Sequence, residues 1–233
     1  MILRNMVKDS HFYKRISKIG LKKRWDIEHS KVRIIKKISK EKIAINAYLC
    51  GDGWISIRID KYQNKHYEIK IFLDDLSLAK YVVSLFEKEF NISPKIVFHQ
   101  GCFNIQIKNK PACLNLLSLG EYSTNNWKIP KNLSKSYIME WIRCFFDCEA
   151  HVNVNKKLIQ VKSVNFNGLS EINERLNLLG INSVLYGPYQ PKNRNHKRYG
   201  MIFITGKENL RLYQRLINFY HPKKKEGLNQ IVL

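Results

Sequence analysis

Two short segments of the chain resemble each other, and each ends an apolar run on a carboxylate. Residues 45–55 read INAYLCGDGWI, and residues 142–152 read IRCFFDCEAHV. Asp52 and Glu149 hold the same position in the two copies. Two carboxylates that lie close together can share a divalent metal ion, and such an ion can assist the hydrolysis of a phosphodiester.

The spacing of small residues within these segments predicts how the two carboxylates could meet. Small residues recur four positions apart in both copies, at Ala47, Gly51, Cys144 and Cys148. Residues four apart share one face of a helix, so the backbones of two such helices can approach closely. We therefore expect two motif helices that pack together, with Asp52 and Glu149 side by side at their ends.

Composition points to an ordered protein with a polyanionic partner. Of 233 residues, 44% are hydrophobic and 12% are aromatic, and 41 Lys and Arg against 19 Asp and Glu give a net charge of +22. Nucleic acid is the leading partner for so basic a chain. No apolar stretch approaches the roughly 20 residues of a membrane span, and the start of the chain does not resemble a signal peptide. We expect no membrane association and a cytoplasmic location, with five cysteines that are buried small residues in a reducing compartment.

The same order of elements follows each motif. In the first copy, apolar periodicity predicts strands at 54–62 and 67–73, a helix at 76–90, strands at 95–99 and 103–108, and a helix at 110–118. In the second copy, it predicts strands at 151–155 and 158–166, a helix at 169–179, strands at 183–187 and 199–205, and a helix at 207–219. Together with its motif helix, each copy is an αββαββα unit. The fold class is therefore α+β, with two pseudo-symmetric repeats.

Four segments follow from this pattern. Residues 1–40 form a basic N-terminal arm with helical character at about 29–39, and residues 41–118 form the first repeat. Residues 119–136 read as a linker, and residues 137–233 form the second repeat with a basic C-terminal tail. The arm either contacts DNA or covers one end of the core, and the sequence favours neither.

Three stretches together resemble the LAGLIDADG homing endonucleases, in the single-chain archaeal form with two motif copies. Residues 47–53 (AYLCGDG) are similar to the first motif, and residues 143–150 (RCFFDCEA) to the variant in which Glu is the acidic residue. Residues 219–225 (FYHPKKK) resemble the stretch that often ends these domains. The resemblance covers about residues 42–228.

The resemblance implies a saddle of antiparallel sheets around a central pair of motif helices, lying over the major groove of double-stranded DNA. It implies a monomer with internal pseudo-two-fold symmetry that cuts both strands of a long, asymmetric target site. Asp52 and Glu149 would be the catalytic metal ligands, and the carbonyls of Gly51 and Cys148 would complete the coordination. Hard Mg²⁺, or Mn²⁺, suits these oxygen ligands.

The second copy departs from the family pattern at three positions. Cys144 and Cys148 stand where the family has Gly or Ala, and both are small enough to pack there. Ala150 replaces the glycine that follows the acidic residue. A glycine would allow a strained exit from the helix that a Cβ disfavours, so Ala150 puts cleavage in question more than fold or DNA binding.

Lysines and polar strand residues supply further candidates. Lys70 and Lys162 lie on the second strand of each copy and are matched candidates for stabilising charge at the scissile phosphate, or else ordinary lysines facing DNA or solvent. Side chains that alternate toward the groove could read bases and bind phosphates, although any open sheet would show the same alternation. The DNA-binding candidates are Ser56, Arg58, Asp60, Tyr62, Asn104, Gln106, Lys108, His151, Asn153, Asn155, Lys157, Lys192, Arg194, Lys197 and Arg198.

Two functions fit these observations. The first is a site-specific, metal-dependent double-strand DNA endonuclease, of intron, intein or free-standing origin. The second is a non-cleaving nucleic-acid binder, either an RNA maturase that assists the splicing of an intron RNA or a decayed DNA-binding relative. Retention of both acidic residues favours the nuclease, and the altered second motif leaves the non-cleaving binder as an alternative.

Overall fold

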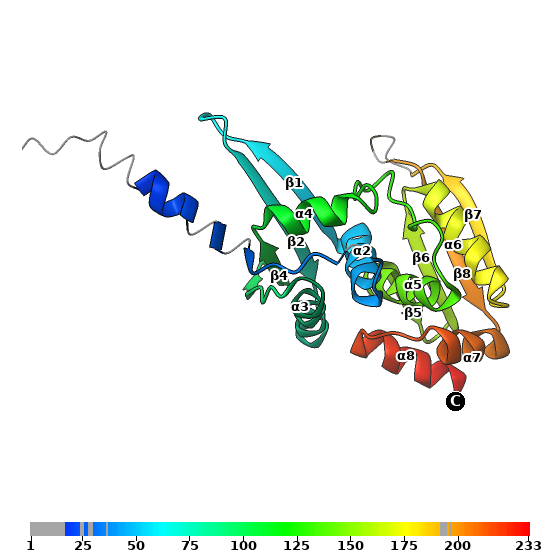
Figure 1. Ribbon diagram of the computed structural model, residues 1–233. Coiled ribbons are helices and arrows are strands. Elements are labelled where there is room, and N and C mark those ends of the chain that lie inside the picture. The colour runs from blue at the N-terminus through cyan, green and yellow to red at the C-terminus, as the bar shows by residue number, and fades with distance from the viewer. Residues whose placement is uncertain (1–16, 24–25, 28–29, 36, 192–194, 196) are drawn as a thin grey trace, which may run out of the picture.

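Among the described residues, the fold is built from two αββαββα repeats, a helix that follows them, and helical residues 17–23, 26–27 and 30 that precede them (Figure 1). The computed structural model describes residues 17–23, 26–27, 30–35, 37–191, 195 and 197–233. The first repeat comprises α2 (Lys40–Asp52), β1 (Gly53–Ile59), β2 (Lys65–Leu73), α3 (Leu76–Phe90), β3 (Ile96–His99), β4 (Cys102–Ile107) and α4 (Lys110–Leu117). The second comprises α5 (Lys135–Glu149), β5 (Ala150–Asn153), β6 (Leu158–Ser163), α6 (Phe166–Leu178), β7 (Ser183–Tyr189), β8 (Tyr199–Thr205) and α7 (Lys207–Leu216), and α8 (Pro222–Val232) follows.

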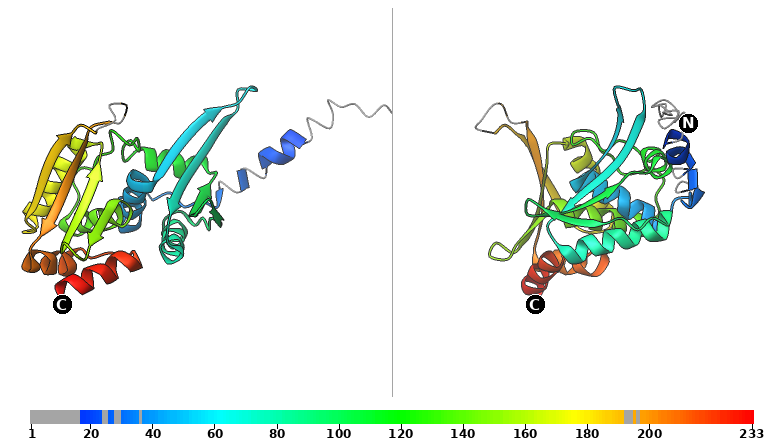
Figure 2. Two further views of the ribbon diagram at one scale, coloured as in Figure 1. Left: turned by 180° about the vertical axis from the view of Figure 1, so that it is seen from behind. Right: turned by 90° about the vertical axis from the view of Figure 1, so that its left-hand side faces the viewer.

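Within the described residues, each repeat forms one four-stranded antiparallel sheet. The strand orders are β1-β2-β4-β3 and β5-β6-β8-β7, so the two sheets have the same topology. The motif helices α2 and α5 lie between the sheets (Figure 1), and the turned views in Figure 2 agree. The predicted α+β fold of two pseudo-symmetric repeats around a central helix pair is confirmed. No helix in the described part of the chain is both long and apolar enough to span a membrane.

Side-chain caps fix where the main helices begin. A side-chain oxygen of the residue before the helix accepts a backbone N–H from the first turn of α2, α3, α4, α5 and α6; the capping residues are Ser39, Asp75, Asn109, Ser134 and Asn165. Each such cap contributes about 1 kcal/mol. The start of each motif helix is therefore set locally, and so is the distance from that start to its terminal carboxylate.

The core surrounds the first motif helix. Residues 42–50 of α2 are all buried, because this helix packs on α5 and also beneath the first sheet. In β2, Ile69 and Ile71 are buried, whereas Lys70 between them is only partly buried on the opposite face. Strand residues alternate between faces, so each sheet turns one face to the core and leaves the other open.

The linker is anchored on the second repeat. Residues 118–134, all of which the structure describes, lie outside helices and strands. Trp127 is buried, its ring centroid lies 4.5 Å from that of Phe145, and its carbonyl accepts a 2.7 Å hydrogen bond from Asn165 Nδ2. A Cβ at Gly168 would lie 2.4 Å from the Trp127 ring. Glycine at that position therefore allows the linker to cross the start of α6.

Two predicted segments differ from the structure. The described residues from 32 to 39 lie outside any helix, because they run along the end of α3, where Arg33 N donates to the Phe90 carbonyl at 3.1 Å. The expected helix at 29–39 is thus wrong for this part. The expected C-terminal tail is instead α8, since Pro222 stands in its first turn and Leu228 and Ile231 bury its apolar side.

Candidate active site

The two motif helices approach each other closely beside the predicted carboxylates. A Cβ built on Gly51 would lie 2.5 Å from Cys148 Cβ and 3.8 Å from Glu149 Cγ. Asp52 directly follows Gly51, and both motif helices end on their carboxylates. The predicted small-residue contact therefore exists, and it brings the ends of the two repeats together at Asp52 and Glu149.

The environment of this pair disfavours two negative charges without a cation. Burial raises the pKa of Asp52, and a hydrogen bond from the Cys148 thiol opposes this rise. Burial, and then the charge of Asp52, raises the pKa of Glu149 to about 7. Removing carboxylates from water and placing them near each other both penalise the ionised forms. A divalent cation bound between them would relieve both effects.

The groups at the pair fit a magnesium-type site. Within the described residues, no cluster of three or more His, Cys, Asp or Glu side chains could hold a metal. Mg²⁺ needs no such cluster, because it binds through one or two carboxylates and keeps water or phosphate oxygens as its other ligands. Asp52 and Glu149 would supply the carboxylates, and the Gly51 carbonyl lies beside them at the end of α2.

A lysine from α8 occupies the carbonyl end of the second motif helix. Lys224 Nζ donates to the carbonyls of Phe146 at 3.3 Å, of Asp147, and of Cys148 at 2.9 Å. Burial lowers the pKa of Lys224, and the anionic groups around it oppose that effect. The Cys148 carbonyl, a predicted metal ligand, is thus already hydrogen-bonded to an ammonium group.

Asp147 joins the two repeats beneath the carboxylate pair. Its Oδ2 accepts a 2.9 Å hydrogen bond from the Tyr48 hydroxyl on α2. Its Oδ1 accepts backbone N–H bonds from Tyr220 at 3.0 Å and His221 at 2.9 Å. Burial raises the pKa of Asp147 to about 6. This side chain holds α2, α5 and the chain leading into α8 in one arrangement.

Comparison with known proteins gives a match in sequence and a match in fold. Residues 136–218 match the family model of the LAGLIDADG-like domain. The fold is similar to that of I-DmoI in complex with DNA and Mn over 78% of this chain and 97% of that one, with a TM-score of 0.62 and 16% identity. The predicted LAGLIDADG resemblance is confirmed.

Two curated relatives are much longer proteins. The chain is 27% identical over 190 residues to a probable translation initiation factor IF-2 of Methanocaldococcus jannaschii, and this match covers 78% of the chain but 15% of that protein. It is 26% identical over 170 residues to a DNA polymerase of Thermococcus kodakarensis, covering 71% of the chain and 10% of the polymerase. The chain therefore spans only a small part of either relative.

Ala150 does not strain the end of the second motif helix. Ala150 has φ −80° and ψ 143°, and Gly53 in the first repeat has φ −133° and ψ 176°. Both are ordinary extended conformations, so the expected strained exit is wrong. Gly53 is needed for space instead, because a Cβ there would lie 2.9 Å from Leu49 Cα.

Many predicted DNA-binding residues lie on the open faces of the two sheets. Register places Ser56 and Arg58 of β1 opposite Glu68 and His66 of β2, on the face opposite the buried Ile69 and Ile71. The residues that share this open face in the first sheet are Trp54, Ser56, Arg58, His66, Glu68, Lys70, Asn104 and Gln106. The corresponding face of the second sheet carries His151, Asn153, Gln160, Lys162, Met201 and Phe203.

The two candidate lysines are not at equivalent positions. Gly53 pairs with Ile71 and Ala150 pairs with Val161, so the residue opposite Trp54 is Lys70 but the residue opposite His151 is Gln160. Lys162 lies two residues further along β6, with its Nζ 3.9 Å from the centroid of the Tyr199 ring. The expected match between Lys70 and Lys162 is wrong, because the connection between the first two strands is shorter in the second repeat.

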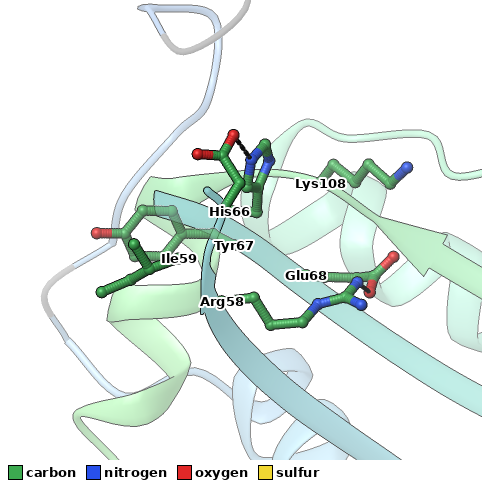
Figure 3. Close-up of a pocket in the computed structure, with 7 residues that line it drawn as sticks. Arg58, Ile59, His66, Tyr67, Glu68 and Lys108 are labelled. Carbon is green, nitrogen blue, oxygen red and sulfur yellow. Dashed lines mark hydrogen bonds and ion pairs between the residues drawn. The ribbon is translucent and has the colours of Figure 1, made fainter. Parts of the chain in front are cut away.

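Glu68 is a residue of the open face that sequence reasoning missed. Its side chain is only 4% exposed, and its carboxylate accepts from Arg58 Nη2 at 2.7 Å and from Gln106 Nε2. Lys70 Nζ lies 3.8 Å away. Figure 3 shows Glu68 beside Arg58 in a cavity of about 390 Å³ that Lys108 also lines. Three predicted candidates are therefore tied to one buried carboxylate.

Other DNA-binding candidates organise or lie in turns, lie in loops, or fall outside the described residues. The Asp60 carboxylate accepts from the backbone N–H groups of Tyr62 and Asn64 and pairs with His66 at 3.0 Å, and Asn153 Oδ1 accepts from Lys156 N. Both side chains thus organise hairpin turns, with Asn155 and Lys157 in the second turn. Arg198 Nε donates to Gln190 and Lys197 Nζ to Asn125. Lys192 and Arg194 lie outside the described residues.

Filling the space at Gly51 should weaken the fold. Gly51→Ala would place a Cβ against Cys148 Cβ, which is fixed to a helix backbone and has little freedom to yield. We expect a loss of about 1–3 kcal/mol in the free energy of unfolding, the usual cost of overpacking, measured by urea denaturation. Gly20→Ala is the matched control, because a Cβ there has no neighbour within 4 Å. Equal stability of the two variants would show that the motif helices do not meet as described.

Proposed function

We propose that the protein is a site-specific double-strand DNA endonuclease that depends on Mg²⁺ or Mn²⁺. The observation that supports this most is the meeting of Asp52 and Glu149, one from each repeat, at the contact between Gly51 and Cys148. A single carboxylate at a helix end would be an ordinary polar terminus. Two carboxylates at the pseudo-symmetric junction, each adjoining an open sheet face, are what cleavage of two strands requires.

A divalent metal bound at this pair would supply charge neutralisation at the attacked phosphate and an activated water. Asp52 and Glu149 would hold it, and the Gly51 carbonyl would offer a neutral oxygen ligand. Lys70 lies on the open face with its Nζ 5.3 Å from the centroid of the Trp54 ring. From there its ammonium could stabilise charge on a phosphate of the bound strand.

Double-stranded DNA is the proposed partner. The net charge of +22 suits a phosphate backbone, and the polar side chains of the two open faces could contact base edges in the major groove. The two faces carry different side chains at corresponding positions. Gln106 pairs with Lys70 in the first sheet, whereas Phe203 pairs with Gln160 in the second. A protein with unlike halves would prefer a target with unlike halves.

An insertion within a host protein is the proposed origin. The two curated relatives carry unrelated names, yet each matches this chain over only 10–15% of its length. A segment shared by otherwise different proteins is expected of a mobile coding element such as an intein. This origin would not alter the chemistry proposed for the carboxylate pair.

The experiment that tests the proposal uses a randomised duplex library. Purified protein is incubated with the library in Mg²⁺ or in EDTA, and newly formed ends are sequenced. Recurrent Mg²⁺-dependent double-strand ends within one long sequence are the expected result. Tight binding without new ends would overturn the nuclease proposal and favour a non-cleaving nucleic-acid binder.

Neutralising Glu68 should increase non-specific DNA binding. Glu68→Gln removes the buried charge that holds Arg58 and Gln106, so the open face becomes more positive and Arg58 is released toward phosphates. We expect affinity for a random duplex to rise about 3- to 10-fold, with a salt dependence steeper by about one phosphate contact. Fluorescence anisotropy at several salt concentrations measures both quantities.

The matched control for this prediction is Glu171→Gln. Glu171 lies on α6 and pairs with Arg175 of the same helix at 3.4 Å, so it changes the net charge equally without touching the open face of the first sheet. An equal rise in affinity for both variants would mean that net charge alone is responsible. In that case Glu68 would have no special role at this surface.

A further inference from the structure

One cationic side chain is built into the candidate metal site. Lys224 Nζ lies at the C-terminal end of α5, within hydrogen-bond distance of three successive carbonyls that end at Cys148. A helix C-terminus carries partial negative charge, so an ammonium group is favourable there. The adjoining residue, Glu149, is one of the two carboxylates, and Lys224 also interacts electrostatically with both Asp52 and Glu149.

The position of Lys224 is fixed by contacts on both sides of it. His221, three residues earlier, places its Nε2 3.1 Å from Asp74 of the first repeat, and its backbone N–H donates to Asp147. Leu228 and Ile231, further along α8, are buried in the core. The lysine is therefore held in place rather than extended into solvent, unlike its exposed neighbours Lys223 and Lys225.

The first repeat has a different arrangement after its last helix. There α4 is followed by residues 118–134, which the structure describes as linker without a helix, and the buried Trp127 in that linker packs on α5. In the second repeat, by contrast, α7 is followed by helix α8. The carbonyl end of α5 thus receives a cation from α8. Residues 118–134, which follow the last helix of the first repeat, contain no helix that could correspond to α8.

We propose that Lys224 is a positioning residue that supplies a fixed positive charge at the Asp52–Glu149 pair, keeps the divalent metal away from the Cys148 carbonyl, and directs it to the Gly51 side. This inference rests on the proposed metal-dependent function. The proposed role of Lys224 makes the site asymmetric. The first motif offers the Asp52 carboxylate and the Gly51 carbonyl, and the second offers the Glu149 carboxylate alone. The fixed charge also repels an incoming divalent cation, so the lysine weakens metal binding while it sets the metal's place.

Direct measurement of Mn²⁺ binding tests the proposal without relying on cleavage. The free Mn²⁺ signal is followed by electron paramagnetic resonance during titration of the full chain without DNA. We expect Lys224→Gln and Lys224→Met to bind Mn²⁺ with a Kd at least tenfold lower than the parent protein, because the repelling charge is gone and the Cys148 carbonyl is released. Lys225→Met removes the same charge from an exposed position of α8 and should stay within about twofold.

Lys224→Gln and one further variant, Asp52→Asn, separate the possible failures. Lys224→Gln keeps N–H donors for the α5 carbonyls, so it remains testable if Lys224→Met does not fold. Unchanged Mn²⁺ affinity in a folded Lys224→Gln protein would overturn the proposal and leave the lysine as a helix cap, because a cap has no reason to weaken metal binding. If Asp52→Asn does not reduce Mn²⁺ binding, the carboxylate pair is not the metal site, and the proposed function fails for its own reason.

Discussion

Asp52→Asn is expected to lower Mg²⁺-dependent cleavage of the recovered target about 10²- to 10³-fold, and Glu149→Gln is expected to do the same. Each change removes one of the two carboxylates proposed to hold the metal where the motif helices meet, and loss of a single preorganised electrostatic group commonly costs 10²–10³ in rate. Affinity for the uncut duplex should stay within about threefold, because the open sheet faces are untouched. Gel assays of cleavage in Mg²⁺ and of binding in EDTA measure the two effects.

Controls for this prediction come from the rest of the chain. Glu171→Gln also removes an acidic side chain, but on α6 and away from the motif helices, so its cleavage rate should match the parent protein. Circular dichroism of all three variants checks that they are folded. Residual cleavage within tenfold of the parent in both Asp52→Asn and Glu149→Gln would contradict a catalytic role for the pair, and loss of folding in both would make the two acids structural.

The second large effect is expected at Lys42, which forms a fully buried ion pair. Lys42 Nζ lies 3.1 Å from Glu89 Oε1, and the two side chains are 3% and 1% exposed. Lys42→Met would leave the Glu89 carboxylate buried without its cation. We expect a loss of about 3–5 kcal/mol in the free energy of unfolding, the usual cost of removing one partner of such a pair. Urea denaturation followed by circular dichroism measures it.

Replacing both partners should restore much of this loss. A well-packed apolar pair often matches a buried ion pair in stability, so Lys42→Met with Glu89→Leu should be more stable than Lys42→Met alone. If the single and double variants were equally unstable, the loss would come from packing and not from the stranded charge.

The same pair anchors the N-terminal segment, since Lys42 Nζ also contacts the Ile35 carbonyl and Arg33 Nε donates to the Glu89 carbonyl at 3.4 Å. For residues 33–35 and 37–39 this favours a cover over the core.

Local periodicity and repetition were enough to predict most of the fold. The helix at 76–90 was predicted with the bounds of α3, and the strand at 199–205 with those of β8. Alternating strands and apolar helix stripes depend on nearby residues, so they can be read from a single chain. The carboxylate pair was predicted for a related reason, because Asp52 and Glu149 occupy matching places in two copies of one motif.

The features that were missed depend on contacts between distant segments. Lys224 was one lysine among three in a row, and only the docking of α8 distinguishes it from Lys223 and Lys225. Glu68 was one acidic residue in a strand, and its burial follows from the pairing of β2 with both β1 and β4. Register likewise decided that Gln160, and not Lys162, corresponds to Lys70. No local pattern carries this information.

The docking of residues 220–224 sets an order in which the protein can mature on the ribosome. Tyr220, His221 and Lys224 hold the last turn of α5 and bridge to Asp74 of the first repeat. All of them are translated after both motifs. A nascent chain that has emerged only as far as β8 therefore contains both acidic residues but lacks the contacts from residues 220–224 that hold the end of α5. We therefore expect the arrangement proposed for cutting DNA to be held in place only after residues 220–224 have been made.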